Sequence, residues 1–155
     1  MARREGAPRA IPKVIVLDTN VISELMRPKP DVRITSWLNR LSRQEVWITA
    51  ISIFELRFGI ELHAKGQRRS HLEDSLARIL EVGFHDRILS FDEKAANAAA
   101  LLSAKQRMMG RSKEVRDTFI AGIVTAHRAD LATRNVRHFQ GLEIRVIDPW
   151  ANEQA

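Results

Sequence analysis

Three acidic side chains stand where a parallel sheet would bring them together. Asp18 directly follows the aliphatic run of residues 14–17. Glu55 follows a predicted strand at 46–49, and Asp117 lies in the first turn of a predicted helix. Ligands of open α/β sheets bind in the crevice at the carboxyl ends of the strands, so we expect these carboxylates to share one site. Carboxylates that lie close together repel one another and raise one another's pKa unless a cation compensates their charge.

A hard divalent cation would remove this repulsion. Mg²⁺ prefers oxygen ligands and keeps several waters. It also lowers the pKa of a bound water and neutralises charge that develops on a phosphodiester. Asn135 follows a predicted strand at 130–133 and offers an amide oxygen at the same edge. The pattern therefore predicts a Mg²⁺ site with four candidate ligands: Asp18, Glu55, Asp117 and Asn135.

Each acid also has a structural interpretation that the sequence leaves open. Ser52 and Glu55 have the spacing of a capping box, in which Glu55 would accept from the backbone N–H of Ser52. Asp117 would complement its helix dipole, and Asp18 would cap the helix after it. The basic segment 105–116 is either a solvated helix end or a phosphate-backbone contact beside the acids, through Arg111, Lys113 and Arg116.

Alternating strands and helices must position these side chains. Aliphatic runs predict strands at residues 14–17, 46–49, 87–91, 130–133 and 144–147. Cap residues and apolar spacing predict helices at 21–26, 32–41, 52–64, 70–81, 93–109 and 115–129. This order predicts an α/β fold with a mostly parallel central β-sheet flanked by α-helices.

The composition is typical of one soluble globular domain. The 155 residues are 45% hydrophobic and 28% charged. No apolar run is long enough to span a membrane. The chain has no cysteine, which excludes thiolate metal sites and suits a reducing cytoplasm, where we expect the protein to act. We predict a domain at 14–150 between a basic, disordered leader (1–13) and a short tail (151–155).

Charge and motifs exclude several other classes. The net charge is +6, but the leader supplies half of it, so the body is only mildly basic. No Gly-x-Gly-x-x-Gly, P-loop or Gly-x-Ser-x-Gly sequence occurs, so nothing indicates a dinucleotide, nucleotide or hydrolase-elbow site. The histidines lack metal-site spacing, so we expect surface or partly buried side chains at His63, His71, His85, His127 and His138.

Five sequence blocks occur in the order typical of a known family. They are VLDTNVISEL at 16–25, TAISIFELRFGI at 49–60, DTFIA at 117–121, ATRNVRHF at 132–139 and VIDPW at 146–150. On these blocks the chain resembles the PIN-domain ribonucleases of the VapC toxin family, in particular the FitB-like branch. The resemblance implies a PIN fold and hydrolysis of RNA that depends on Mg²⁺ or Mn²⁺.

The resemblance also assigns roles to individual residues. It places Asp18, Glu55 and Asp117 on the family's metal-binding acids. Around them it implies a polar shell of Asn20 and Ser23, which we expect Thr133 to join. Two positions depart from the family pattern, because Asn135 and His138 stand where the family often has acids. We therefore expect one firmly held ion, with a second recruited by the substrate phosphate.

The implied biological role is that of a toxin. The family implies a homodimer and a VapB-like antitoxin, assembled as a heterotetramer or larger, with DNA bound only through the antitoxin. The Ala-rich helix is a candidate dimer face, through Ala95, Ala96, Ala98, Ala99, Leu102 and Met109. We predict a metal-dependent endoribonuclease whose metal-activated water attacks the phosphorus. The alternatives are a weakly active or inactive PIN module in a transcriptional repressor complex, and a DNA-directed nuclease.

Overall fold

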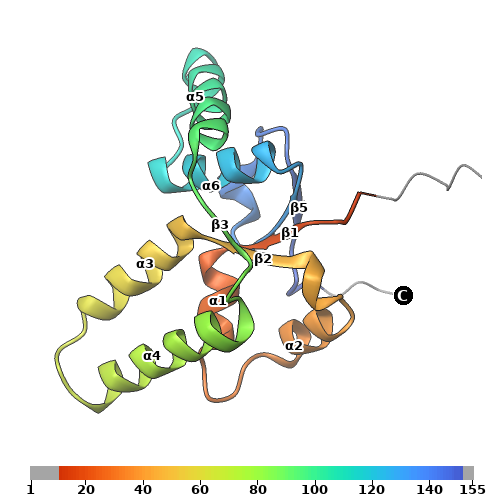
Figure 1. Ribbon diagram of the computed structural model, residues 1–155. Coiled ribbons are helices and arrows are strands. Elements are labelled where there is room, and N and C mark those ends of the chain that lie inside the picture. Colours follow the sequence, from red (N-terminus) through yellow and green to blue (C-terminus); the bar gives the residue numbers. More distant parts are fainter. Residues whose placement is uncertain (1–10, 152–155) are drawn as a thin grey trace, which may run out of the picture.

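Five parallel strands form one sheet with helices on both faces (Figure 1). The computed structural model describes residues 11–151, so most of the predicted leader and tail lies outside the described residues, and the domain bounds stay a prediction. The strand order is β3-β2-β1-β4-β5. The strands are β1 (Ile15–Leu17), β2 (Val46–Thr49), β3 (Ile88–Leu89), β4 (Asp130–Ala132) and β5 (Arg145–Ile147).

Within residues 11–151, six α-helices connect the strands. They are α1 (Thr19–Leu25), α2 (Val32–Asn39), α3 (Ala50–Glu61), α4 (Gln67–Arg78), α5 (Glu93–Met108) and α6 (Val115–Ala126). Two 3₁₀ turns, Arg43–Glu45 and Val136–Phe139, and a π-helical turn, Ile79–Gly83, complete the described secondary structure. The predicted α/β fold with a mostly parallel sheet is confirmed.

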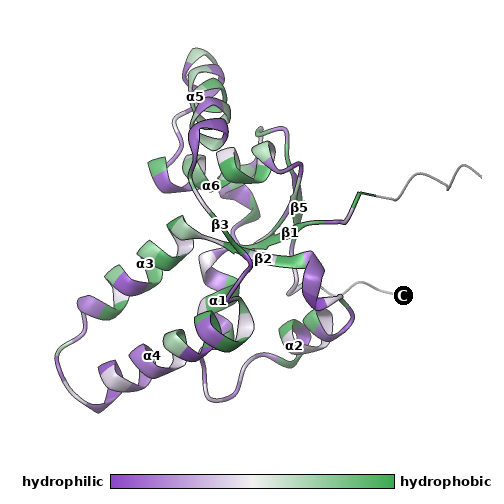
Figure 2. Ribbon diagram, in the orientation of Figure 1, coloured by the Kyte–Doolittle hydropathy of each residue, from purple (hydrophilic) through white to green (hydrophobic). Residues whose placement is uncertain are grey.

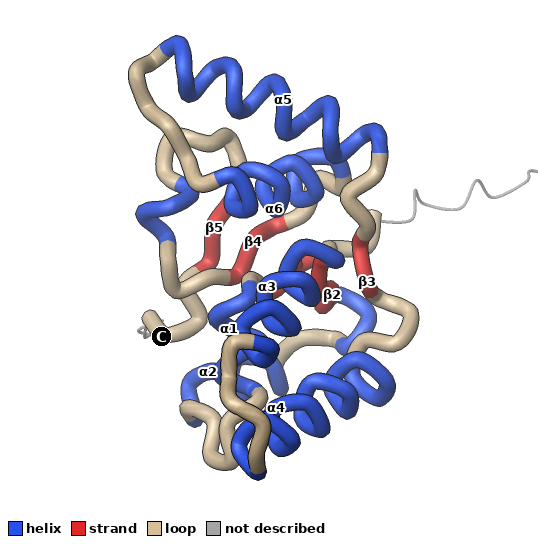
Figure 3. Tube along the Cα trace, turned by 90° about the vertical axis from the view of Figure 1, so that its left-hand side faces the viewer, coloured by secondary structure: helices blue, strands red, loops and turns tan. Residues whose placement is uncertain are grey.

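The central strand β1 shows why its sequence is uniformly aliphatic. Ile15 and Leu17 pack into a core beneath α1 to α4, whereas Val16 packs into a second core beneath α5 and α6. All three side chains are fully buried. Figure 3 shows the two helical layers on opposite sides of the sheet, and Figure 2 shows the hydrophobic strands between them. A strand covered on both faces needs apolar side chains in both directions.

Several predicted boundaries shift for local reasons. Helix α3 begins at Ala50 because Thr49 caps it, with the Thr49 Oγ1 accepting from the backbone N–H of Ser52 at 3.0 Å. Helix α6 ends at Ala126, before the predicted end at 129, because Arg128 takes a left-handed conformation with φ of 50°. Strand β3 covers only two of the five residues predicted for it.

Helices α5 and α6 approach each other unusually closely at Gly122. A Cβ atom there would lie 2.5 Å from the carbonyl oxygen of Ala95 and 2.7 Å from the Cβ of Ala99. Ala95 and Ala99 are therefore buried within the chain, and their predicted contribution to a dimer face is wrong. Over residues 11–151, no helix combines the length and hydrophobicity needed to cross a membrane.

Candidate active site

A pocket opens where β1 and β4 end, with a cavity volume of about 620 Å³. The four predicted metal ligands line it, as do the predicted polar-shell residues Asn20 and Ser23. Three arginines and several further polar side chains complete the wall. The full lining is Asp18, Thr19, Asn20, Ser23, Glu24, Arg27, Glu55, Glu114, Arg116, Asp117, Arg134, Asn135, His138 and Trp150.

Asp18 is the buried carboxylate of this pocket, with 5% of its surface exposed. Its Oδ1 accepts from the backbone N–H of Thr19 at 2.8 Å, so Asp18 also caps α1. Its Oδ2 accepts from the Thr133 hydroxyl at 2.7 Å and from the Asn20 amide at 3.1 Å. Burial raises the pKa of Asp18, and these hydrogen bonds oppose the rise. The capping and site interpretations therefore both hold for this residue.

Asn20 and Thr133 tie the ends of two strands together around Asp18. The Asn20 amide also donates to the Thr133 hydroxyl at 3.1 Å, and its Oδ1 accepts from the backbone N–H of Arg134 at 3.0 Å. The Thr133 hydroxyl accepts from the backbone N–H of Asn135 at 3.0 Å. Thr133 is fully buried, so this polar group is held in one orientation.

The capping-box interpretation of Glu55 is wrong. Thr49 caps α3, and Ser52 lies inside the helix. The Glu55 Oε1 instead accepts from the Thr19 hydroxyl at 2.9 Å, and its Oε2 lies 3.6 Å from an Arg116 Nη1. Burial raises the pKa of Glu55, while the Thr19 hydroxyl and the charge of Arg116 oppose the rise.

Asp117 lies in the first turn of α6, where its charge complements the helix dipole, and Glu114 caps the helix. The Glu114 Oε2 accepts from the backbone N–H groups of Arg116 at 2.9 Å and of Asp117 at 3.3 Å. The Asp117 Oδ2 instead lies 3.1 Å from Nδ1 of His138. Burial raises the pKa of Asp117, His138 lowers it, and the charge of Asp18 adds to the rise.

One of the three predicted RNA-contact residues lines this pocket. Arg116 lines the pocket, but Arg111 and Lys113 do not. The Lys113 Nζ lies 3.5 Å from the carbonyl oxygen of Arg137. The guanidinium of Arg111 lies beside Gly141.

The donor chemistry of the pocket fits Mg²⁺. Carboxylate and amide oxygens are its preferred protein ligands, and it retains several waters, so few direct ligands suffice. Each carboxylate is currently compensated by separate protein donors, and among residues 11–151 no three His, Cys, Asp or Glu side chains form a ready-made metal centre. Residues that would hold the ion are Asp18, Glu55, Asp117 and Asn135.

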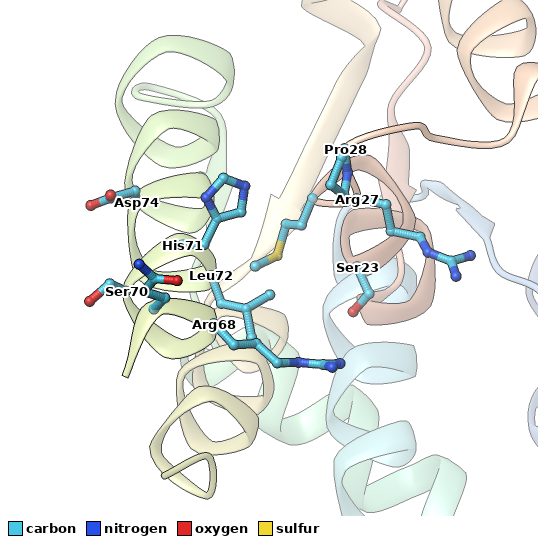
Figure 4. A pocket seen from close by; sticks show the side chains of 10 residues that line it. Ser23, Arg27, Pro28, Arg68, Ser70, His71, Leu72 and Asp74 are labelled. Carbon is cyan, nitrogen blue, oxygen red and sulfur yellow. The ribbon is translucent and has the colours of Figure 1, made fainter. Parts of the chain in front are cut away.

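A second pocket, with a cavity volume of about 790 Å³, lies between α1 and α4. Figure 4 shows its wall, with Arg68 and His71 from α4 facing Ser23 and Pro28. It shares Ser23 and Arg27 with the acidic pocket but contains one carboxylate, that of Asp74. Its lining lacks the converging acids, so the candidate chemistry lies in the smaller pocket.

Sequence reasoning missed several residues of the site. Glu114 accepts from the backbone N–H of Asp117, and the His138 ring lies beside the Asp117 carboxylate. The guanidinium of Arg134 lies 5.4 Å from the ring of Trp150. His138 was predicted as an ordinary surface or partly buried histidine, and its side chain is 54% exposed yet lines the pocket. The family resemblance had already placed His138 at a position where the family often has an acid, which was the available signal.

The sequence profile of one protein family matches residues 15–142, and its description is PIN domain. The chain belongs to the PIN domain family. This finding confirms the resemblance that the sequence blocks indicated. The pocket of this PIN domain therefore lies in a fold shared by its relatives.

Curated relatives match almost their whole length. Toxin FitB of Neisseria gonorrhoeae is 35% identical over 137 residues, which cover 88% of this PIN domain and 99% of the relative. VapC ribonuclease Y4jK of Sinorhizobium fredii is 34% identical over 137 residues, which cover 88% and 98%. Among solved structures, FitAB bound to an IR36 DNA fragment matches with a TM-score of 0.81 and 34% identity, covering 90% of this chain and 98% of that one.

Proposed function

We propose that this PIN domain is the toxin of a VapBC-type toxin–antitoxin system and acts as a Mg²⁺-dependent endoribonuclease. The observation that carries the proposal is one pocket whose wall contains the carboxylates of Asp18, Glu55 and Asp117 together with arginines. Relatives named as a toxin and as a ribonuclease support it. Because the proposed substrate is cellular RNA, we place this activity in the cytoplasm.

The residues would divide the work by position. Asp18, Glu55, Asp117 and Asn135 would hold Mg²⁺, with Mn²⁺ as an alternative ion. Such an ion supplies a more acidic water and offsets negative charge on the phosphoryl oxygens.

The rest of the pocket would hold these ligands and the substrate in place. Asn20 and Thr133 fix the orientation of the Asp18 carboxylate through the bonds described above. Arg116 would contact the RNA phosphate, since a guanidinium pairs well with phosphate oxygens. The exposed amide of Asn135 would orient water beside the reacting phosphate.

The proposed partner is a VapB-like antitoxin. A solved relative, FitAB, is described as bound to a DNA fragment, which supports a complex that reaches DNA through the antitoxin. We propose a homodimer that assembles with antitoxin into a heterotetramer or larger complex. A weakly active module in such a repressor complex is the second candidate, because Asn135 leaves the pocket without a fourth carboxylate at that position.

Substitution Asp18→Asn tests the proposal. It retains the side-chain volume and removes the charge, so we expect RNA cleavage to fall by about 10²-fold or more while circular dichroism stays unchanged. The matched control is Asp86→Asn, which neutralises an exposed aspartate outside the pocket and should cleave like wild type.

Two outcomes would contradict the proposal. Full cleavage by folded Asp18→Asn would remove the proposed metal site. If the wild-type protein does not bind Mg²⁺ and does not cleave a broad RNA pool, the repressor-module hypothesis is favoured. Parallel digests of RNA and DNA would identify a DNA-directed nuclease.

A further inference from the structure

Arginine side chains place positive charge in the same pocket as the candidate metal-binding acids. Three arginines line the pocket: Arg27, Arg116 and Arg134. Within residues 11–151, Arg116 alone among lysines and arginines forms an ion pair with one of the three candidate metal-binding carboxylates, that of Glu55. Arg27 pairs with Glu24, and the guanidinium of Arg134 lies over Trp150.

The carboxylate of Glu114 holds the Arg116 side chain in this position. Its Nε donates to the Glu114 Oε1 at 3.0 Å, while the other oxygen of Glu114 caps the helix through the backbone of Arg116 and Asp117. The guanidinium therefore has its Nε side fixed and its Nη1 directed at Glu55. The side chain of Arg116 is 38% exposed and that of Glu55 is 22% exposed, so the pair sits at the mouth of the pocket.

This contact occupies a carboxylate that the proposed metal needs. A divalent ion at Glu55 would lie against the positive charge of Arg116, and two like charges so close disfavour each other. When the ion takes Glu55, the Nη groups of Arg116 lose their partner while Nε remains tethered. A guanidinium with free Nη donors at the mouth of an RNA-cleaving site is suited to bind an oxygen of the phosphodiester.

We propose that Arg116 is an internal counter-cation that competes with the divalent metal for Glu55 and transfers to the RNA phosphate once the metal binds. This inference rests on the proposed ribonuclease function and adds a regulation of its site. Metal and substrate binding are then coupled, because each releases a partner for the other. RNA should therefore bind more tightly when Mg²⁺ is present, beyond the effect of Mg²⁺ on RNA alone.

The test is Mg²⁺ titration of the purified full chain by calorimetry without RNA. Arg116→Gln should bind Mg²⁺ about threefold more tightly than wild type, the size expected for losing a partly exposed ion pair. In Mg²⁺, the same variant should bind a short single-stranded RNA with non-hydrolysable phosphorothioate linkages about threefold more weakly than wild type. In EDTA, where Arg116 stays paired with Glu55, the two proteins should bind this RNA alike. These opposite changes distinguish competition from general damage to the pocket.

The matched control is Arg27→Gln. It removes an equal charge from the pocket wall, but Arg27 is paired with Glu24, so the Mg²⁺ affinity should stay close to wild type. Arg116→Lys keeps the positive charge, so its Mg²⁺ affinity should stay close to that of wild type and below that of Arg116→Gln. Circular dichroism checks that each variant is folded.

The results separate the two proposals. Wild-type protein that binds Mg²⁺ and cleaves RNA, with unchanged or weaker Mg²⁺ binding in Arg116→Gln, overturns the competition and leaves the ribonuclease proposal standing. Wild-type protein without measurable Mg²⁺ binding overturns both. Tighter Mg²⁺ binding with weaker RNA binding supports the inference.

Discussion

Asp18 is both the N-cap of helix α1 and the buried acid of the pocket. It is a buried carboxylate, and its oxygens accept three hydrogen bonds, from Thr19, Asn20 and Thr133. Burial favours the protonated carboxyl, while the donors favour the carboxylate. The balance leaves its pKa raised, and a cation at this position would favour the ionised form. Glu55 and Asp117 share the same direction of shift.

Cleavage should therefore depend on pH through these carboxyls. Only their ionised forms would hold the metal, and their pKa values are raised above the ordinary 3.8 of Asp and 4.5 of Glu. Activity at low Mg²⁺ should be lost as pH falls through a window above those values. Protons and metal compete for the same oxygens, so more Mg²⁺ should move this acid limb to lower pH. A limb at ordinary carboxyl values that ignores Mg²⁺ would refute this.

Helix α6 begins on a residue with two functions. The Glu114 carboxylate caps the helix and also holds the Arg116 guanidinium. Glu114→Ala should lower the free energy of unfolding by about 1 kcal/mol, the usual effect of losing an N-cap. Urea unfolding measures this loss. Glu114→Asp provides another capping carboxylate and should recover most of the stability; equal losses in both variants would contradict the capping role.

The contact between α5 and α6 depends on one glycine. Gly122→Ala would place a Cβ against the Ala95 carbonyl and the Ala99 side chain, so we expect a loss of about 1–3 kcal/mol from overpacking. Gly59→Ala is the matched control. It lies within α3 with nothing within 4 Å of the new Cβ and should stabilise the protein by up to about 1 kcal/mol. Thermal unfolding would show opposite signs; destabilisation by both would contradict this account.

The whole molecule should be more stable with metal bound. In EDTA, carboxyls with raised pKa values bind more protons in the folded state than in the unfolded state, so their contribution to stability falls as pH rises through that window. Mg²⁺ reverses this above the window. At 100 times its Kd it should add about 2.7 kcal/mol, which for a chain of this size corresponds to a rise in Tm of about 5–10 °C.

The matched variant for this measurement is Asp18→Asn. It lacks the proposed central ligand, so Mg²⁺ should leave its Tm nearly unchanged at neutral pH. Near the ordinary carboxyl pKa, the Mg²⁺ effect should also vanish in wild type because the ligands are protonated. An equal Mg²⁺ shift in both proteins at neutral pH would place the ion elsewhere.

The fold class and the acids that line the pocket could be predicted from the amino-acid sequence. Strand β1 is aliphatic on both faces because two helical layers cover it, a property visible in residues 14–17 alone. Asp18 follows that strand directly, so its place at the sheet edge follows from local pattern. The position of Asp117 in the first turn of helix α6 follows in the same way, whereas Glu55 lies in the middle of α3 because that helix begins earlier than the sequence indicates.

The contacts that each acid makes could not be predicted, because they form between distant parts of the folded chain. The capping box predicted for Glu55 was wrong because Thr49 caps α3 and a hydroxyl from α1 reaches the carboxylate. Likewise, Arg116 and His138 became part of the site through neighbours far away in sequence. The periodicity of hydrophobic residues in the sequence predicts which side chains are buried, because burial follows from hydrophobicity. Which polar groups pair depends on how helices pack across the sheet, and no local pattern contains that information.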